Sequence, residues 1–232
     1  SISREIEKER YMERSTTRLR ALLKEKDFVY MPAVYYPLGG RLIEDMGFDA
    51  AYVGGYVTGG SRAVSEPLLT MTEQVETAEH VARSIKAPVI CDAGAGFGEP
   101  LHVTRTVKEF INAGIAGVHI EDQLFPKRAH YHKYVAHAIP AEELVDKIRW
   151  ACKSREEHDP DFVVIARTDA LAPYGWDDAV RRAECYSAAG ADMVFVDGIK
   201  TEHDLETYAR RLAEQGIACL YNGQLLPTTD VA

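Results

Sequence analysis

The chain has 232 residues, of which 46% are hydrophobic and 27% charged, a balance typical of an ordinary globular domain. Its formal net charge of −9 excludes a general binder of nucleic acid or anionic membranes, because such proteins concentrate lysine and arginine. The four cysteines form no C-x-x-C pair and no apolar run approaches the ~20 residues that span a bilayer. We therefore expect a cytoplasmic protein without disulfides or a secretory signal.

One pattern recurs after an N-terminal helix that we expect within residues 1–26: an amphipathic helix, a glycine and a short apolar strand. It occurs at Arg41–Val53, Val107–Ile120, Ala183–Val196 and Leu212–Tyr221. Glycine adopts the left-handed conformation that ends a helix, and near-continuous apolar strands are typical of a parallel sheet covered by helices.

Three more strands and five helices fill the intervals between these segments. The strands are expected at Phe28–Met31, Pro88–Cys91 and Phe162–Ala166, and the helices at Thr72–Lys86, Leu101–Ala113, Ala141–Arg155, Asp177–Ala189 and Glu202–Gln215. Strand and helix thus alternate along the whole chain, which indicates the α/β class.

Seven strands predict a single (β/α)₈ TIM-type barrel domain over residues 1–232, with the barrel starting at residue 27. On this interpretation the last strand and the C-terminal helices are missing from the chain. A doubly wound open sheet is the alternative. However, the first expected strand runs into residues 32–39, which lack the glycine-rich nucleotide turn of that fold.

Barrel active sites gather at the carboxyl ends of the strands. The residues expected there are Gly54, Gly55, Tyr56, Asp92, Glu121, Asp122, Arg167, Thr168, Asp169, Asp197 and Asn222. Acids and one arginine therefore converge on one end of the predicted barrel, where solvent loops would carry polar residues without preference. This convergence predicts an active site at that end of the barrel.

Asp92 and Glu121 end neighbouring predicted strands. Two carboxylates, completed by water and substrate, are a usual way to hold Mg²⁺, or Mn²⁺ in its place. An aspartate at a strand end also fits a helix N-cap, and we expect Asp122 and Asp169 to be such caps or to support the metal ligands without binding the metal. Arg167 suits bidentate recognition of a carboxylate or phosphate, and it equally fits an ion pair with a neighbouring aspartate.

The loop at 122–137 is long for a connection between strand and helix, which is typical of an active-site lid. Lys127 and Arg128 could neutralise an anionic substrate there, although an adjacent basic pair is also common on solvated surfaces. His130 and His132 could transfer protons, or could be ordinary loop histidines. Gly54, Gly55 and Tyr56 could line the pocket.

Three segments resemble motifs of the isocitrate lyase / phosphoenolpyruvate mutase superfamily. Val89–Gly98 and Val118–Arg128 resemble its D-A-D-x-G-[FY]-G and V-x-I-E-D-x-x-x-x-K-[KR] segments, and Ile165–Ala170 resembles its I-A-R-T-[ED]-A strand. The resemblance implies a Mg²⁺-dependent (β/α)₈ barrel, commonly a homotetramer, that acts on small carboxylates or phosphonates through an enolate-like intermediate.

The resemblance also assigns roles to individual residues. It implies that Asp92 and Glu121 belong to the metal site, that Lys127 is the gating-loop lysine, and that Arg167 and Asn222 bind substrate. Several positions depart from the pattern. Gly94 replaces the second aspartate of D-A-D, Ala129 replaces the cysteine that serves as acid and base in isocitrate-type lyases, and Gly54-Gly55 stands where the family has an S-G strand end. His130, Tyr131 and His132 are the candidates to replace this cysteine.

Three functions remain open on the sequence. The first is a Mg²⁺-dependent carbon–carbon lyase for a small 2-hydroxy or 2-oxo dicarboxylate. The second is a phosphonopyruvate-type hydrolase or phosphoenolpyruvate mutase, which needs no lid cysteine. The third is a non-catalytic barrel relative, against which stands the retention of Asp92, Glu121, Lys127 and Arg167.

Overall fold

The computed structural model describes residues 13–127 and 137–223. Six strands form one sheet in the order β1-β2-β3-β4-β5-β6. Their bounds are β1 (Ala51–Val53), β2 (Val89–Asp92), β3 (Gly117–Glu121), β4 (Val163–Thr168), β5 (Met193–Val196) and β6 (Ala218–Leu220). This sequential order matches a β/α barrel and differs from a doubly wound sheet, in which the order reverses.

The expected helices are present, with ends that differ from the prediction by a few residues. They are α2 (Ser15–Glu25), α3 (Pro37–Asp45), α4 (Gly55–Ser61), α5 (Met71–Ala82), α6 (Pro100–Asn112), α7 (Ala141–His158), α8 (Leu171–Tyr174), α9 (Trp176–Ala188) and α10 (Glu202–Ala213), besides a 3₁₀ turn η1 (Glu66–Leu68). Gly47, Gly114, Gly190 and Gly216 all have positive φ after helices, which confirms their predicted role.

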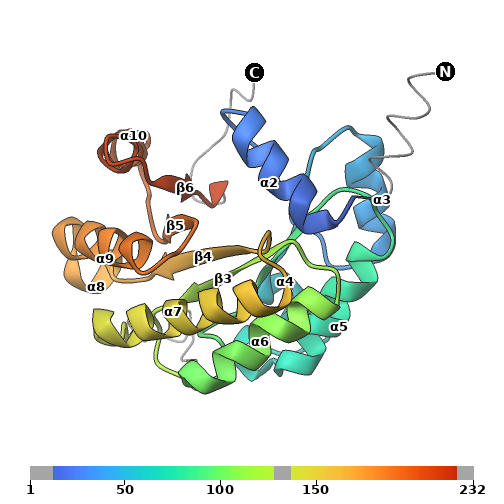
Figure 1. Cartoon of the computed structure of the whole chain (residues 1–232), viewed down its shortest axis with the longest axis horizontal. Coiled ribbons are helices and arrows are strands. Elements are labelled where there is room, and N and C mark those ends of the chain that lie inside the picture. Colours follow the sequence, from blue (N-terminus) through green and yellow to red (C-terminus); the bar gives the residue numbers. More distant parts are fainter. Residues whose placement is uncertain (1–12, 128–136, 224–232) are drawn as a thin grey trace. The chain divides into compact units, whose positions relative to one another are not determined.

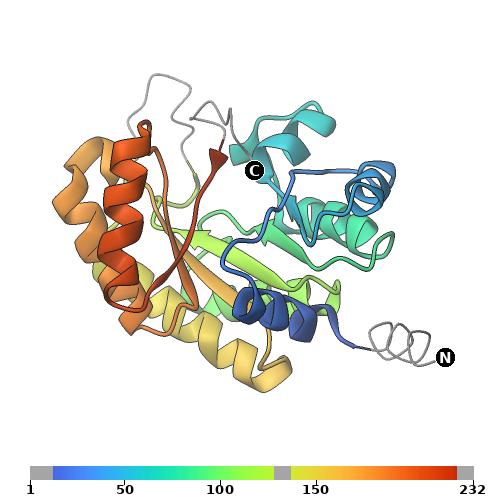
Figure 2. The ribbon, with the colours of Figure 1, turned by 90° about the horizontal axis from the view of Figure 1, so that it is seen from above.

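The chain divides into two compact units. The first contains Ser1–Ala93, Arg105–Val118 and Ser154–Val163. In it, β1 and β2 pair in parallel, with Ala51 opposite Val89, and α5 packs on both β2 and α3. Figure 1 shows α3 and α5 in blue and teal, and Figure 2 turns the same ribbon by 90°. A capping box between Thr70 and Glu73 begins α5.

The second unit contains Gly94–Thr104, His119–Lys153 and Val164–Ala232. Strand β5 pairs in parallel with β4 and β6, while α9 packs on β5 and α10 on β6. The apolar sides of these elements form a buried cluster of Ala179, Val180, Ala183, Val194, Val196, Ile199, Tyr208 and Leu212. Both views place α10 beside α9 (Figures 1 and 2).

The expected strand at Phe28–Met31 is wrong, because no strand forms there. Phe28 is 62% exposed and Tyr30 is 42% exposed, so this run does not enter the core. The chain meets β1 a few residues later, where Ala33 forms an isolated parallel bridge with Tyr52. Pro32 has no N–H to extend this pairing. No helix of the described residues is long and apolar enough to cross a membrane.

Candidate active site

In the second unit, neighbouring strand ends bring acidic side chains around Arg167. Glu121 ends β3, Arg167 lies near the end of β4, and Asp197 follows β5. The guanidinium of Arg167 donates through Nε and Nη2 to the two carboxylate oxygens of Asp169, at 3.0 and 2.7 Å. Its Nη2 also lies 3.2 Å from Asp197 Oδ2, and its Nε lies 3.5 Å from Glu121 Oε2.

Lys127 supplies a second cation in the same place. Its Nζ lies 3.0 Å from Glu121 Oε1, and its side chain is only 8% exposed. Two cations therefore face three carboxylates, those of Glu121, Asp169 and Asp197. We call these five residues the acid–base cluster. Of the two alternatives from the sequence, the ion pair with a neighbouring aspartate is confirmed, and recognition of a carboxylate or phosphate by Arg167 stays a prediction.

The charges of the cluster stabilise one another. Burial disfavours the charged form of Arg167, but Asp169, Asp197 and Glu121 outweigh this effect and raise the pKa of Arg167 well above its ordinary value. Burial alone would likewise raise the pKa of Asp169, yet Arg167 and Lys127 hold it below its ordinary value. The guanidinium also lies over the ring of Phe195, 5.1 Å from its centroid.

In the first unit, Asp92 and Glu66 meet at Gly55. Asp92 is buried at the end of β2, and its Oδ2 accepts a hydrogen bond from the Gly55 N–H at 3.1 Å. A Cβ at Gly55 would lie 3.0 Å from that oxygen and 2.9 Å from Glu66 Cγ. The side chains of Asp92 and Glu66 therefore fill the space that a side chain at position 55 would need. Asp92 therefore contacts the first turn of α4.

The other predicted substrate residues differ in their surroundings. Gly54 precedes α4, Tyr56 is 69% exposed in its first turn, and Asn222 is half-buried just after β6. Arg128, His130 and His132 lie outside the described residues, as does most of the predicted lid. The base of that loop is described: Gln123 and Ala138 form an antiparallel bridge, and Leu124 N–H donates to His137 O at 3.0 Å.

The glycine-rich segment after β2 is a tight turn. Gly94, Gly96 and Gly98 all have positive φ, and a Cβ at Gly96 would lie 2.7 Å from Val103 Cγ2. The turn is held by Lys147 of α7, whose buried Nζ donates to Ala95 O at 3.0 Å. Burial lowers the pKa of Lys147, an effect partly offset by Glu99, Glu143 and Glu121.

Sequence analysis missed Lys147 and Arg182, both of which are buried. The available signal was their spacing, because each lies on the apolar side of its helix. Lys147 lies between the buried Leu144 and Ile148, and Arg182 lies between Ala179 and Tyr186. A long cation on a core-facing stripe indicates a buried polar partner.

The donors present fit a magnesium ion held by few protein ligands. Within residues 13–127 and 137–223, no group of three or more His, Cys, Asp or Glu side chains is arranged to hold a metal ion. Mg²⁺ needs only one or two carboxylates when water and substrate oxygens complete its octahedron. Asp92 and Glu66 provide carboxylate oxygen, the donor type that Mg²⁺ prefers. Glu121 contacts Lys127 and Arg167, and its role as a second metal carboxylate stays a prediction.

Comparison with known proteins identifies the family. The family model described as phosphoenolpyruvate phosphomutase matches residues 19–232. The chain is 38% identical to a 2-methylisocitrate lyase of Aeropyrum pernix over 87% of this chain and 64% of that protein. It is 35% identical to a 2,3-dimethylmalate lyase of Eubacterium barkeri, over 92% of this chain and 73% of that protein.

A solved structure supports the same assignment. The structure of a phosphonopyruvate hydrolase complex with oxalate and Mg²⁺ is similar with a TM-score of 0.84 and 28% identity, covering 94% of this chain and 75% of that one. The chain belongs to the isocitrate lyase / phosphoenolpyruvate mutase superfamily, as the three sequence motifs predicted. It spans 61–73% of the length of curated relatives such as these.

Proposed function

We propose that the protein is a Mg²⁺-dependent lyase that cleaves a carbon–carbon bond of a small 2-hydroxy or 2-oxo dicarboxylate through an enolate. The observation that carries this proposal is the acid–base cluster, in which the buried Arg167 at the end of β4 and the largely covered Lys127 of the loop after β3 face three carboxylates. Relatives named as 2-methylisocitrate and 2,3-dimethylmalate lyases support carbon–carbon cleavage.

Arg167 is the residue we assign to a substrate carboxylate. Its contacts with the three acids engage Nε and Nη2, so the remaining amino group, Nη1, is the one assigned to the substrate. The carboxylate of Asp169 accepts two hydrogen bonds from Arg167 and so keeps its guanidinium group from rotating. This favours a single orientation of the bound anion. Lys127 provides a second positive charge in a site largely shielded from water, where charge interactions are strong.

Magnesium, or manganese in its place, would polarise the substrate's α-oxygen when bound and so favour the enolate. Asp92 is its proposed carboxylate ligand, with Glu66 beside it at Gly55. By family resemblance we also propose the (β/α)₈ barrel and a homotetramer, which sedimentation velocity would measure.

A substrate panel tests this function. We expect 2,3-dimethylmalate, a 2-hydroxy dicarboxylate, to release a 2-oxo acid in the presence of Mg²⁺, and Arg167→Ala and Asp92→Ala to abolish the release. Arg149→Ala is the matched control, because this arginine is exposed on α7 and should leave the rate unchanged. Phosphate release from phosphonopyruvate, without carbon–carbon cleavage, would instead favour the hydrolase alternative. If no substrate reacts and oxalate with Mg²⁺ does not bind, the enzyme proposal is wrong.

A further inference from the structure

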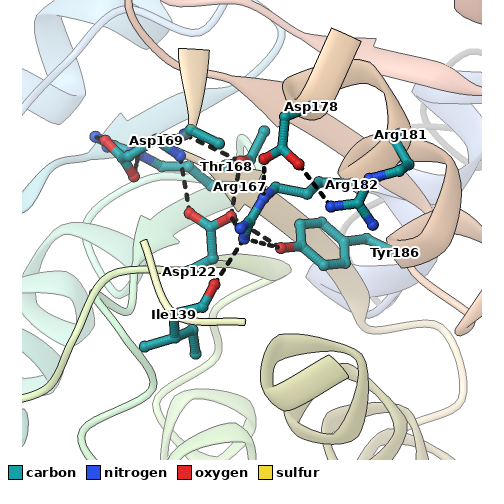
Figure 3. Close-up of polar contacts among 10 residues, drawn as sticks. Asp122, Ile139, Arg167, Thr168, Asp169, Asp178, Arg181, Arg182 and Tyr186 are labelled. Carbon is teal, nitrogen blue, oxygen red and sulfur yellow. Dashed lines mark hydrogen bonds and ion pairs between the residues drawn. The ribbon is translucent and has the colours of Figure 1, made fainter. Parts of the chain in front are cut away.

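The carboxylate of Asp122, next to Glu121 in the chain, is fully buried and accepts four hydrogen bonds (Figure 3). Its Oδ2 accepts from the Thr168 hydroxyl at 2.7 Å, the Tyr186 hydroxyl at 2.8 Å and Arg182 Nη1 at 3.1 Å. Its Oδ1 accepts from the backbone N–H of Asp169 at 2.9 Å. A helix N-cap needs only one or two such bonds, so this set of donors exceeds what capping explains.

Two of these bonds hold the short segment that carries Asp169. The Thr168 hydroxyl donates to Asp122 and accepts from the Ala170 N–H at 3.2 Å. The Asp169 N–H donates to the other oxygen of the same carboxylate. Asp122 therefore fixes the backbone on both sides of the Asp169 Cα, and the Asp169 side chain in turn holds the fork of Arg167.

Arg182 of α9 supplies the charge that a buried carboxylate needs. Besides Asp122, its guanidinium donates to Asp178 Oδ2 at 2.5 Å and to the backbone oxygen of Ile139 at 2.7 Å. Figure 3 shows Arg182 and Tyr186 approaching Asp122 from the same helix. Burial, followed by the charge of Asp169, raises the pKa of Asp122, whereas its hydrogen bonds oppose this shift. These hydrogen bonds thus favour the ionised form of Asp122.

We infer that Asp122, held by Arg182 and Tyr186, is a positioning residue that sets the orientation of Arg167 toward the substrate carboxylate. This inference rests on the proposed function, because it assigns Arg167 to substrate. Helix α9 then determines the geometry of the carboxylate subsite without touching substrate. An asparagine at position 122 cannot replace the aspartate, because one of its two terminal atoms is an NH₂ group that cannot accept a hydrogen bond. This group would face either the Asp169 N–H or the three donors at the other oxygen.

Calorimetric titration of oxalate in the presence of Mg²⁺ tests the inference. We expect Asp122→Asn to weaken oxalate binding at least tenfold, and Tyr186→Phe, which removes one donor and keeps the ring, to weaken it a few fold. In an assay with a substrate that the enzyme converts, both substitutions should raise KM by a larger factor than they lower kcat. Thr16→Val is the matched control, because it removes a buried hydroxyl that donates to a carboxylate, Asp159, in the first unit. It should lower the melting temperature but leave oxalate affinity unchanged.

The outcomes separate this inference from the proposed function. If the wild type binds oxalate, Arg167→Ala abolishes binding, and both Asp122→Asn and Tyr186→Phe bind as the wild type does, the positioning role is wrong and the function stands. If Thr16→Val weakens oxalate binding as much as Tyr186→Phe, the effect is general destabilisation and the inference is also wrong. If the wild type binds no oxalate with Mg²⁺, the proposed function fails first. If Asp122→Asn does not fold, the oxalate affinity of Tyr186→Phe alone decides whether the positioning role is correct.

Discussion

At Gly55, the addition of a single methyl group should have a measurable effect on metal binding. Its hydrogen atom faces two carboxylates, and a methyl group would lie 2.9 Å from Glu66 Cγ and 3.0 Å from Asp92 Oδ2. We expect Gly55→Ala to displace one of these side chains and to weaken Mn²⁺ binding, measured by electron paramagnetic resonance, by an order of magnitude.

Gly60 offers the control within the same helix. A Cβ there would have no heavy atom within 4 Å. Gly60→Ala should leave Mn²⁺ binding unchanged and should increase the free energy of unfolding by about 0.5–1 kcal/mol, as expected when alanine replaces glycine inside a helix. Equal Mn²⁺ affinities for the two variants would show that the carboxylates at Gly55 hold no metal.

Asp169 should make stability depend on pH in the acid range. Its pKa is lower in the folded chain than the ordinary value of about 3.9. A carboxylate of this kind contributes stability above its unfolded pKa, and this contribution is lost as the pH falls through the folded pKa. The free-energy difference between the wild type and Asp169→Asn should therefore be constant above about pH 5 and shrink below about pH 4.

Urea unfolding at a series of pH values measures this difference. Asp146→Asn serves as the control, since Asp146 forms only an exposed pair with Arg149. A difference between the wild type and Asp169→Asn that does not change with pH would mean that Arg167 and Lys127 do not lower the pKa of Asp169.

At the scale of the elements, helix α2 is attached to another segment of the chain by side-chain hydrogen bonds. The Thr16 hydroxyl donates to Asp159 at 2.8 Å, the Thr17 hydroxyl donates to Asp161 at 2.6 Å, and Arg20 Nε donates to the backbone oxygen of Asp161 at 2.9 Å. The helix has no side-chain N-cap of its own. Its attachment therefore depends on the turn between α7 and β4.

Thr16→Val should lower the free energy of unfolding by about 1–3 kcal/mol, because the buried Asp159 loses a donor. Hydrogen exchange should also become faster in α2 first, which chemical denaturation alone would not reveal. Unchanged protection of the α2 amides would contradict this account.

Periodicity predicted the elements better than it predicted their contacts. Helices and strands followed from apolar spacing and from glycine at helix ends, and the strand-end acids followed from the shared edge of a parallel sheet. The run at Phe28–Met31 has strand composition, yet its side chains stay exposed. Arg182 and Lys147 could not be assigned, because their partners lie far along the chain: Asp122 is 60 residues from Arg182, and Ala95 is 52 residues from Lys147.

At the scale of the whole molecule, the net charge of −9 means that an anionic substrate must be captured locally. We expect Mg²⁺ and oxalate together to raise the melting temperature more than the sum of their separate effects, because oxalate chelates Mg²⁺ and the two binding equilibria are then coupled. Thermal unfolding with and without EDTA measures this effect, and Asp92→Ala should remove the Mg²⁺-dependent part. Strictly additive shifts would mean that metal and anion bind independently.

Gly94 shows how little separates this chain from the common motif of its family. The backbone there has φ +51°, a region that aspartate enters more readily than most residues, and a Cβ would meet no heavy atom within 4 Å. An aspartate at position 94 would therefore meet no clash at its Cβ. We expect Gly94→Asp to fold at a cost of about 1–2 kcal/mol and to bind Mg²⁺ more tightly by calorimetry.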